Sequence, residues 1–273
     1  MSFIKTKIAI LLFLFCTFLS SVINAKSLDK TYNLSEELSI KKVTNDVFVV
    51  THSFPWPANS MLVKCSDGNF IWVDTPYNNE ATKQVFDWLQ SNFGKIRITQ
   101  INTGFHNDNL GGNGFLKQRG IDIYGSHLTV RLLNERVEQT RSQILKWLEK
   151  PKFKRFYEAH KTAVYTKPTK LFDLGNGLNL IIGGEKVEVY YPGPSHSIDN
   201  VVVYFPNKKL LFGGCMIKSI KSKNLGFIGD ADTKQWPISL KKLLIRYSDA
   251  QIVVPGHGTS GSIDLISHTL TLF

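Results

Sequence analysis

Strand-like and helix-like patterns follow one another along the first half of the chain. Short apolar runs separated by turn residues predict strands at residues 47–50, 60–65, 70–74, 96–103 and 121–124. Apolar positions spaced three and four residues apart predict amphipathic helices at residues 80–93 and 128–149. Two prolines interrupt residues 53–59, so we expect a loop there with Trp56 at its tip.

The second half repeats the same order of elements. The pattern predicts strands at residues 178–182, 187–190, 201–205, 210–212 and 251–254. It predicts helices at residues 236–247 and 262–272. Because each half supplies strands and then helices, we predict an α/β fold: an αββα sandwich of two mixed β-sheets with helices on the outer faces. No linker divides residues 26–273, which we interpret as a single domain.

The N-terminus has the pattern of a secretory signal peptide. Residues 1–25 combine a basic start, an apolar stretch at 8–19 and small residues before a cleavage point after Ala25. The apolar stretch is shorter than the roughly 20 residues of a spanning helix, so we expect no stable membrane span after cleavage. A lipoprotein cut before Cys16 is the alternative, but bulky Phe15 stands where a small residue is expected. The sequence therefore predicts a periplasmic or secreted protein.

Composition and charge narrow the class of protein. The 273 residues are 42% hydrophobic and 20% charged, which excludes a disordered or collagen-like chain. The formal net charge is +11, and removing the signal peptide lowers it by two, because that segment holds two lysines and no acidic residue. No recognisable nucleic-acid-binding module accompanies this charge, so we expect no nucleic-acid partner. We expect a monomer whose charge favours solubility and attracts anions.

Metal-type side chains occur in four glycine-containing turns, each after a predicted strand. They are His106 and Asp108, then His196, then Cys215, and finally His257. Glycines in these turns let the backbone bend sharply and leave room at the side-chain tips. Carboxylate, thiolate and imidazole together make a mixed ligand set that suits zinc. Three protein ligands would leave a fourth position for water, as in a catalytic zinc site.

Cysteine and histidine usage leaves one alternative open. Cys65 and Cys215 remain after signal removal, and an oxidising compartment permits a disulfide between them. The remaining histidines lack a glycine-turn context and are assigned to surface or packing roles: His52, His127, His160 and His268.

Several motifs in this chain are those of one family. They are Asn59-Ser60, Val73-Asp74-Thr75-Pro76, Asp108-x-x-Gly111-Gly112, Ser195-His196, Gly213-Gly214-Cys215-Met216-Ile217-Lys218, Asn224-Leu225-Gly226 and Gly229-Asp230-Ala231. From about residue 43 to residue 269 the chain resembles a class B metallo-β-lactamase of the metallo-β-lactamase fold. The resemblance implies zinc-dependent hydrolysis of the amide bond of β-lactam antibiotics, including carbapenems, by a zinc-activated water.

The resemblance also implies roles for individual residues. It implies one tightly bound Zn²⁺ on Asp108, Cys215 and His257. A second, weaker Zn²⁺ site would use His106 and His196. Catalytic roles are implied for Asp108, His106 and His196.

Substrate contacts follow from the same resemblance. Lys218 would pair with the carboxylate of the β-lactam substrate, a role that suits a compact ammonium charge. Trp56 would close over the apolar face of the substrate. Phe227 borders the same site, at a position where the family often has an asparagine that polarises the lactam carbonyl.

The chain departs from the family pattern at one metal-ligand position. Gly104 stands at the first position of the family's His-x-His-x-Asp motif and has no side chain to donate. The number of zinc ions in the active form therefore stays open at this point. Two other functions also stay open: an exported zinc-binding protein with weak or no lactamase activity, and another metallo-hydrolase of this fold. Cys215 and Asn109 argue against the second, since those hydrolases usually have aspartate and histidine there.

Overall fold

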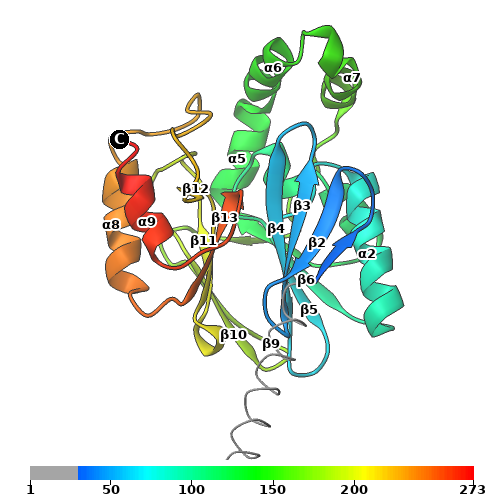
Figure 1. Ribbon diagram of the computed structural model, residues 1–273, viewed down its shortest axis with the longest axis vertical. Helices are drawn as coiled ribbons and strands as arrows, with labels where there is room; N and C mark the ends of the chain where they lie inside the picture. Colours follow the sequence, from blue (N-terminus) through cyan, green and yellow to red (C-terminus); the bar gives the residue numbers. More distant parts are fainter. Residues whose placement is uncertain (1–29) are drawn as a thin grey trace, which may run out of the picture.

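A computed structural model describes residues 30–273, and its strands form two sheets that face each other (Figure 1). The predicted signal peptide lies outside the described residues. Within residues 30–273 the first sheet has eight strands in sequence order: β1 (Thr31–Asn33), β2 (Leu38–Lys42), β3 (Val47–Ser53), β4 (Pro57–Lys64), β5 (Phe70–Val73), β6 (Ile98–Ile101), β7 (Ile123–Ser126) and β8 (Lys170–Phe172). It is antiparallel from β1 to β5 and parallel from β5 to β8.

The second sheet is built from the later part of the chain. Over the same described range it has five strands, in the order β13 (Ile252–His257), β12 (Leu210–Lys218), β11 (Val202–Phe205), β10 (Glu185–Tyr190) and β9 (Leu178–Ile182). Only the β12–β13 pair of this sheet is parallel. Both sheets are therefore mixed, as the sequence predicts.

Apolar side chains from the two inner faces form the central core between the sheets. Met61 and Ile71 from the first sheet and Val203 and Phe212 from the second belong to this cluster and are fully buried. All lie on strands whose alternate residues face inward, so each strand places part of its apolar set in the core. The two sheets are held together by this shared interior.

Helices cover the outer faces, which completes the αββα arrangement (Figure 1). The helix α2 (Asn79–Phe93) packs on the first sheet and buries Val85 and Leu89, together with residues of α4 (Asn113–Gln118). On the second sheet, α8 (Trp236–Arg246) and α9 (Asp264–Leu270) bury Trp236 and Leu240. None of the helices formed by residues 30–273 combines the length and apolar character that crossing a bilayer requires. The predicted fold class is thus confirmed.

The largest difference from the predicted elements lies between residues 127 and 162. The expected helix at 128–149 is two helices, α5 (His127–Glu135) and α6 (Val137–Trp147), because Arg136 leaves helical geometry at φ −123° and ψ −14°. The basic stretch after them forms a short 3-10 turn, η1 (Pro151–Phe153), and α7 (Lys154–Thr162). Figure 1 shows α6 and α7 projecting beyond the ends of both sheets. No glycine or proline marks residue 136, so the sequence carried no signal for the break.

Candidate metal centre and pocket

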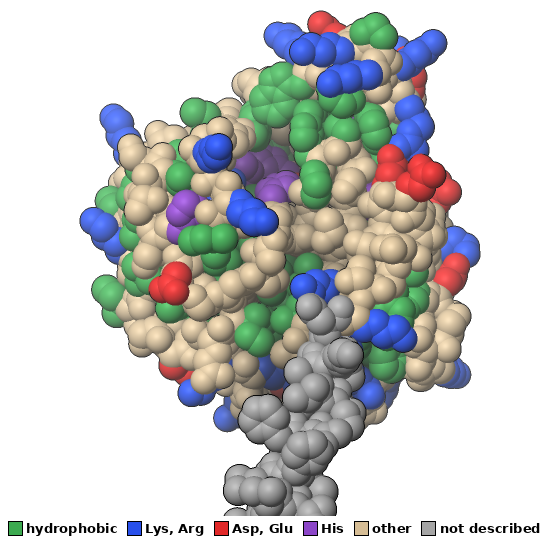
Figure 2. Space-filling view, in the orientation of Figure 1, with side chains coloured by type: hydrophobic (Ala, Val, Ile, Leu, Met, Phe, Trp, Pro, Cys, Tyr) green, Lys and Arg blue, Asp and Glu red, His purple; other side chains and the backbone are tan. Residues whose placement is uncertain are grey.

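A cavity of about 500 Å³ opens at the ends of the two sheets, below the projecting helices. Figure 2 shows histidine side chains in a hollow there, with apolar side chains along its upper rim. Seven of the eight predicted site residues line the cavity: Trp56, His106, Asp108, His196, Lys218, Phe227 and His257. The eighth, Cys215, contacts two of them. The fold thus brings together residues that lie up to 201 positions apart, from Trp56 to His257.

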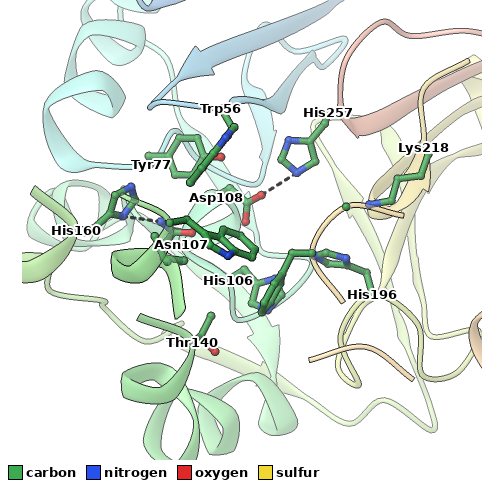
Figure 3. A pocket seen from close by; sticks show the side chains of 14 residues that line it. Trp56, Tyr77, His106, Asn107, Asp108, Thr140, His160, His196, Lys218 and His257 are labelled. Atoms are coloured by element: carbon green, nitrogen blue, oxygen red, sulfur yellow. Dashed lines mark hydrogen bonds and ion pairs between the residues drawn. The ribbon is translucent and has the colours of Figure 1, made fainter. Parts of the chain in front are cut away.

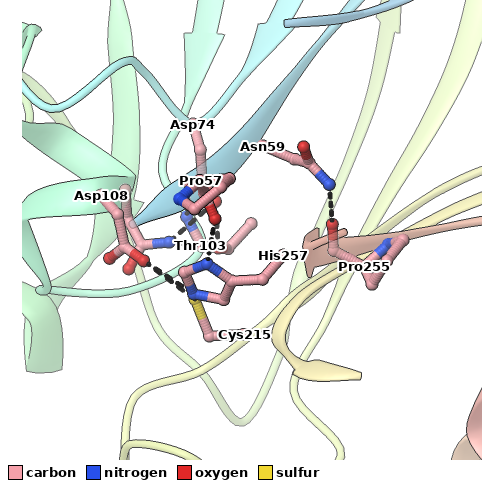
Figure 4. A network of polar contacts seen from close by, with 9 residues as sticks. Pro57, Asn59, Asp74, Thr103, Asp108, Cys215, Pro255 and His257 are labelled. Atoms are coloured by element: carbon pink, nitrogen blue, oxygen red, sulfur yellow. Dashed lines mark hydrogen bonds and ion pairs between the residues drawn. The ribbon is translucent and has the colours of Figure 1, made fainter. Parts of the chain in front are cut away.

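Three of these side chains form a compact triangle. Asp108 Oδ2 lies 3.3 Å from Cys215 Sγ and 3.2 Å from His257 Nε2, and the sulfur lies 3.5 Å from the same nitrogen (Figure 4; the Asp108–His257 contact also in Figure 3). Zinc bonds of 2.0 to 2.3 Å at tetrahedral angles require ligand separations of roughly 3.3 to 3.6 Å. The triangle matches one face of such a tetrahedron, and its carboxylate, thiol and imidazole are ligands that zinc accepts. The residues present therefore fit a zinc ion.

Hydrogen bonds to the backbone orient the imidazole of His257. Its Nδ1 lies 2.7 Å from the carbonyl oxygen of Pro57, which can only accept a hydrogen bond (Figure 4). Nδ1 therefore carries a proton, which leaves Nε2 as the nitrogen that a metal ion in the triangle would bind. Asn59 donates from Nδ2 to the carbonyls of Pro255 and Gly258, at 2.9 and 2.7 Å. These bonds join β4 of the first sheet to the C-terminal end of β13, which carries His257 on the second.

The turn that carries Asp108 is held by a buried carboxylate. Asp74, directly after β5, accepts the backbone N–H and the hydroxyl of Thr103, each at 2.7 Å. It also accepts the side-chain amide of Asn109 at 2.8 Å. Burial raises the pKa of Asp74, and these donors oppose that rise; the resulting pKa is about 8. The network fixes the segment from Thr103 to the short helix α3 (Asn107–Leu110) and so places Asp108 at the pocket floor.

Electrostatic surroundings differ within the triangle. Burial alone would raise the pKa of Asp108, but the hydrogen bond from His257 and the charges of His257 and His106 lower it to about 2. Burial raises the pKa of the Cys215 thiol well above its usual value, and the negative charge of Asp108 raises it further. In the absence of a cation, Asp108 is therefore ionised at neutral pH and Cys215 is protonated. A metal ion that binds here must displace the thiol proton.

The two remaining histidines lie side by side next to this triangle. The ring centroids of His106 and His196 are 5.1 Å apart. Nδ1 of His196 is buried without a hydrogen-bond partner, and burial lowers the pKa of this ring well below its usual value. Nε2 of His106 lies 3.0 Å from Asp230 Oδ2. That hydrogen bond and nearby negative charges outweigh burial and raise the pKa of His106.

Gly104 lies where the family pattern has a third imidazole, and its surroundings are crowded. A Cβ atom at this position would lie 2.9 Å from Asn200 Nδ2, 3.2 Å from Asn109 Oδ1 and 3.6 Å from Ser197 Oγ. Asn109, Asn200 and Ser197 are themselves buried. Polar side chains thus occupy the space beside Gly104, and the second site has two imidazoles.

A buried cation completes the polar part of the pocket. Lys218, at the end of β12, is only 6% exposed, and Figure 3 shows its amine directed toward the cavity. No carboxylate of the described residues forms an ion pair with it, and its Nζ lies 5.2 Å from the centre of the Trp236 ring. Burial lowers the pKa of Lys218, while the neighbouring Cys215 and Asp108 oppose that shift. A buried ammonium without a counter-ion favours binding of an anionic ligand.

Aromatic side chains form the upper rim of the pocket. The Trp147 ring of α6 contacts Trp56 at a centroid distance of 5.9 Å and Phe227 at 5.4 Å, in both cases nearly edge to face. Phe227 in turn lies 5.7 Å from His106. The loop that holds Trp56 comprises only residues 54–56, since β4 begins at Pro57. These contacts connect the first sheet, α6 and the 219–235 loop across the mouth of the cavity.

Sequence reasoning missed several residues of the pocket. Ile144 and Trp147 on α6, and Asn107 beside Asp108, line the cavity without having been singled out. His160 on α7 is buried as the predicted packing role requires, but it also lines the pocket, and its Nδ1 lies 3.1 Å from Asn107 Nδ2. The helical spacing of Ile144 and Trp147 could have indicated that they share one face of a helix. It could not have shown that this face lies over the metal-ligand residues, which are far away in the sequence.

The alternative of a disulfide between the two cysteines is wrong. Cys65 and Cys215 are both free and buried. Cys65 lies against Gly183 at the far end of β4, whereas Cys215 lies between Asp108 and His257. The two thiols therefore occupy different parts of the core, and Cys215 remains available as a ligand.

Known proteins share both this sequence pattern and this fold. The family model described as the metallo-β-lactamase superfamily matches residues 54–257. Two curated proteins named metallo-β-lactamase type 2, from Bacillus sp. (strain 170) and from Bacillus cereus, are each 33% identical over 245 residues, which cover 88% of this chain and 84% of theirs. The solved metallo-β-lactamase from Pontibacter korlensis is 31% identical, with a TM-score of 0.72 and coverage of 86% and 98%. The chain belongs to the metallo-β-lactamase superfamily.

Proposed function

We propose that this protein hydrolyses the amide bond of β-lactam antibiotics in a zinc-dependent reaction, with carbapenems among its substrates. The observation that carries this proposal is the Asp108–Cys215–His257 triangle at the floor of the pocket, beside the unpaired ammonium of Lys218. Membership of the metallo-β-lactamase superfamily supports the reaction type. The pocket volume of about 500 Å³ suits a small bicyclic substrate.

The protein residues would position water and substrate around one tightly held zinc ion. Zinc on Asp108, Cys215 and His257 would supply Lewis acidity for the attack of water and for the negative charge on the departing nitrogen. Oδ2 of Asp108 faces the other two ligands, and neither contact involves Oδ1. That second oxygen of an ionised carboxylate is available to orient the attacking water and accept its proton.

Lys218 and the aromatic rim would bind the substrate. The Lys218 ammonium would pair with the lactam carboxylate, since it is buried and no carboxylate among residues 30–273 forms an ion pair with it. Trp56 and Phe227 would cover the apolar side of the bicyclic ring. His106 and His196 would hydrogen-bond to substrate or water, or bind a second zinc more weakly than the first, because Gly104 supplies no third imidazole.

A zinc titration with two substrates tests the proposal. The metal-free protein is loaded stepwise, metal content is measured, and hydrolysis of imipenem and of a cephalosporin is followed at each step. We expect activity to reach its maximum at one zinc per chain and to be higher on imipenem. Cys215→Ser serves as the matched control, since it removes the thiolate from the triangle and leaves Lys218 and the rim intact. Activity that rises with a second zinc on both substrates would refute the single-zinc form.

A second candidate is an exported zinc-binding protein with weak or no lactamase activity. The Phe227 ring favours it, because an apolar ring lies 5.7 Å from His106 and 6.2 Å from His196, where an amide donor would assist the lactam carbonyl. Stoichiometric zinc binding without turnover of either substrate would select this candidate.

We also propose that the protein is exported and monomeric. The predicted signal peptide at residues 1–25 supports export to the periplasm or the medium. N-terminal sequencing of the secreted or periplasmic protein should begin at Lys26. Sedimentation of the purified protein should give the mass of one chain.

A further inference from the structure

One face of α6 lies along the loop that joins β12 to α8. Thr140 Oγ1 donates to Asp230 Oδ2 at 2.9 Å, and the Trp147 ring packs 5.4 Å from Phe227. Between these contacts, the Cβ position of Gly229 is 2.6 Å from Gln143 Oε1. Residues 140, 143 and 147 recur at helical spacing, so they share a side of the helix. The helix therefore touches residues 227, 229 and 230 of the loop in succession.

The carboxylate in this loop links α6 to one of the pocket histidines. Asp230 Oδ2 accepts from Thr140 Oγ1 at 2.9 Å and pairs with His106 Nε2 at 3.0 Å. All three side chains are buried, with exposed fractions of 7% for Thr140, 8% for Asp230 and 7% for His106. A carboxylate accepts the proton of Nε2, which leaves the lone pair of His106 on Nδ1. Nδ1 is thus the nitrogen that His106 can offer to a metal.

The 219–235 loop contains no helix or strand; backbone bonds from Ala231 to Ile228 and from Asp232 to Ser195 hold the chain beside Asp230, and side-chain contacts orient its carboxylate. The hydroxyl of Thr140 donates to Asp230 Oδ2, which is the same oxygen that pairs with Nε2 of His106. This orientation matters because the site beside Gly104 has two imidazoles, and one of them is His106. Partners that orient metal-binding imidazoles typically change metal affinity by 10- to 100-fold when removed.

We propose that Thr140 is a positioning residue, which acts through Asp230 to orient His106 and so sets the affinity of a second metal ion at His106 and His196. The inference rests on the proposed zinc-dependent function, in which this second site is the weaker one. Helix α6 then has two connected tasks. It lines the pocket with Ile144 and Trp147, and through Thr140 and Asp230 it orients His106.

Cobalt(II) binding to the metal-free protein tests this assignment without measuring activity. Charge transfer from the Cys215 thiolate to cobalt reports occupancy of the first site, and the additional d–d absorption reports occupancy of the second. Thr140→Val keeps the shape of the side chain and removes the hydroxyl. We expect it to weaken the second binding event at least about tenfold and to leave the first unchanged. Thr140→Ser, which retains the hydroxyl, should restore the second affinity.

A matched control comes from a second buried threonine. Thr129 Oγ1 donates to Asp199 Oδ2 at 2.8 Å, a bond of the same kind; Asp199 accepts its other side-chain hydrogen bond from Ser197 Oγ rather than from a histidine, and only its charge acts on His106. Thr129→Val should lower the unfolding temperature but leave both cobalt affinities unchanged. In an Asp230→Asn background, Thr140→Val should cause no further loss of second-site affinity, because its effect passes through that carboxylate.

Three results would overturn the proposal. They are unchanged second-site affinity in Thr140→Val, an equal loss at both sites, or a wild-type protein that binds a single cobalt ion even at saturation. In the last case imipenem hydrolysis by the single-metal protein would still stand, so failure of this inference is distinguishable from failure of the proposed function. If Thr140→Val does not fold, Thr140→Ala is measured in its place against the same expectations.

Discussion

Replacing Gly104 by alanine tests whether neighbouring side chains leave room for any side chain at the position where the family has its third imidazole. The added methyl group would lie 2.9 Å from Asn200 Nδ2 and 3.2 Å from Asn109 Oδ1, well inside the roughly 3.5 to 4.0 Å of an unstrained contact. The backbone at Gly104 does not have a positive φ, so the strain would come from these contacts alone.

The cost follows from what Asn200 would have to give up. This side chain is 1% exposed, donates to the Thr103 carbonyl at 3.3 Å and accepts the Ser197 N–H at 3.0 Å. A shift of a few tenths of an ångström weakens these bonds in a site where water cannot replace them. Overpacking of this kind costs about 1 to 3 kcal/mol. For a chain of this size we expect the melting temperature to fall by about 2 to 12 °C.

Urea and thermal unfolding of the zinc-free protein measure this cost directly. The control is Gly175→Ala, because Gly175 is exposed and a Cβ there meets nothing within 4 Å. Its stability should stay within about 0.5 kcal/mol of the wild type. Gly104→His introduces the same Cβ and should destabilise the protein at least as much as Gly104→Ala. A Gly104→Ala variant as stable as the wild type, with Gly175→Ala also unchanged, would refute the steric argument.

Three further predictions concern the pocket residues. Because burial keeps Cys215 protonated, zinc uptake near pH 7 should release its proton into a weakly buffered indicator solution, and Cys215→Ser should abolish that release. Lys218→Ala should raise KM about tenfold or more for a lactam with a free carboxylate, with little change in kcat; equal KM values for the two proteins would exclude the ion pair. The folded-state pKa of Asp108 is about 2, below its ordinary 3.8, so the unfolded chain binds more protons between these values. The zinc-free protein should therefore lose up to about 2 kcal/mol of stability as the pH falls from about 5 to below 2, and Asp108→Asn should lack this loss in urea unfolding at graded pH.

Much of this protein follows from local pattern in the sequence. The strand and helix periodicities predicted most elements within a few residues, and the order of elements in each half predicted the two-layered sheet core with outer helices. The glycine-containing segments that carry Asp108, Cys215 and His257 were identifiable because each follows an apolar run, but two of the expected turns are wrong: β12 continues through Cys215 to Lys218, and His257 is the last residue of β13. Turns at the ends of strands meet at the edge of a sheet sandwich, so convergence of these side chains was a reasonable expectation.

Only the tertiary structure decided which distant side chains support that site. The break at Arg136 turns α6 over the pocket, and neither glycine nor proline announces it. The bond from Thr140 to Asp230 joins residues 90 positions apart, and that from His106 to Asp230 joins residues 124 apart. Hydrophobic periodicity reports which face of an element is buried, but not which other element buries it. The partners of His106 and the closed space beside Gly104 therefore became visible only once the two sheets and α6 were packed together.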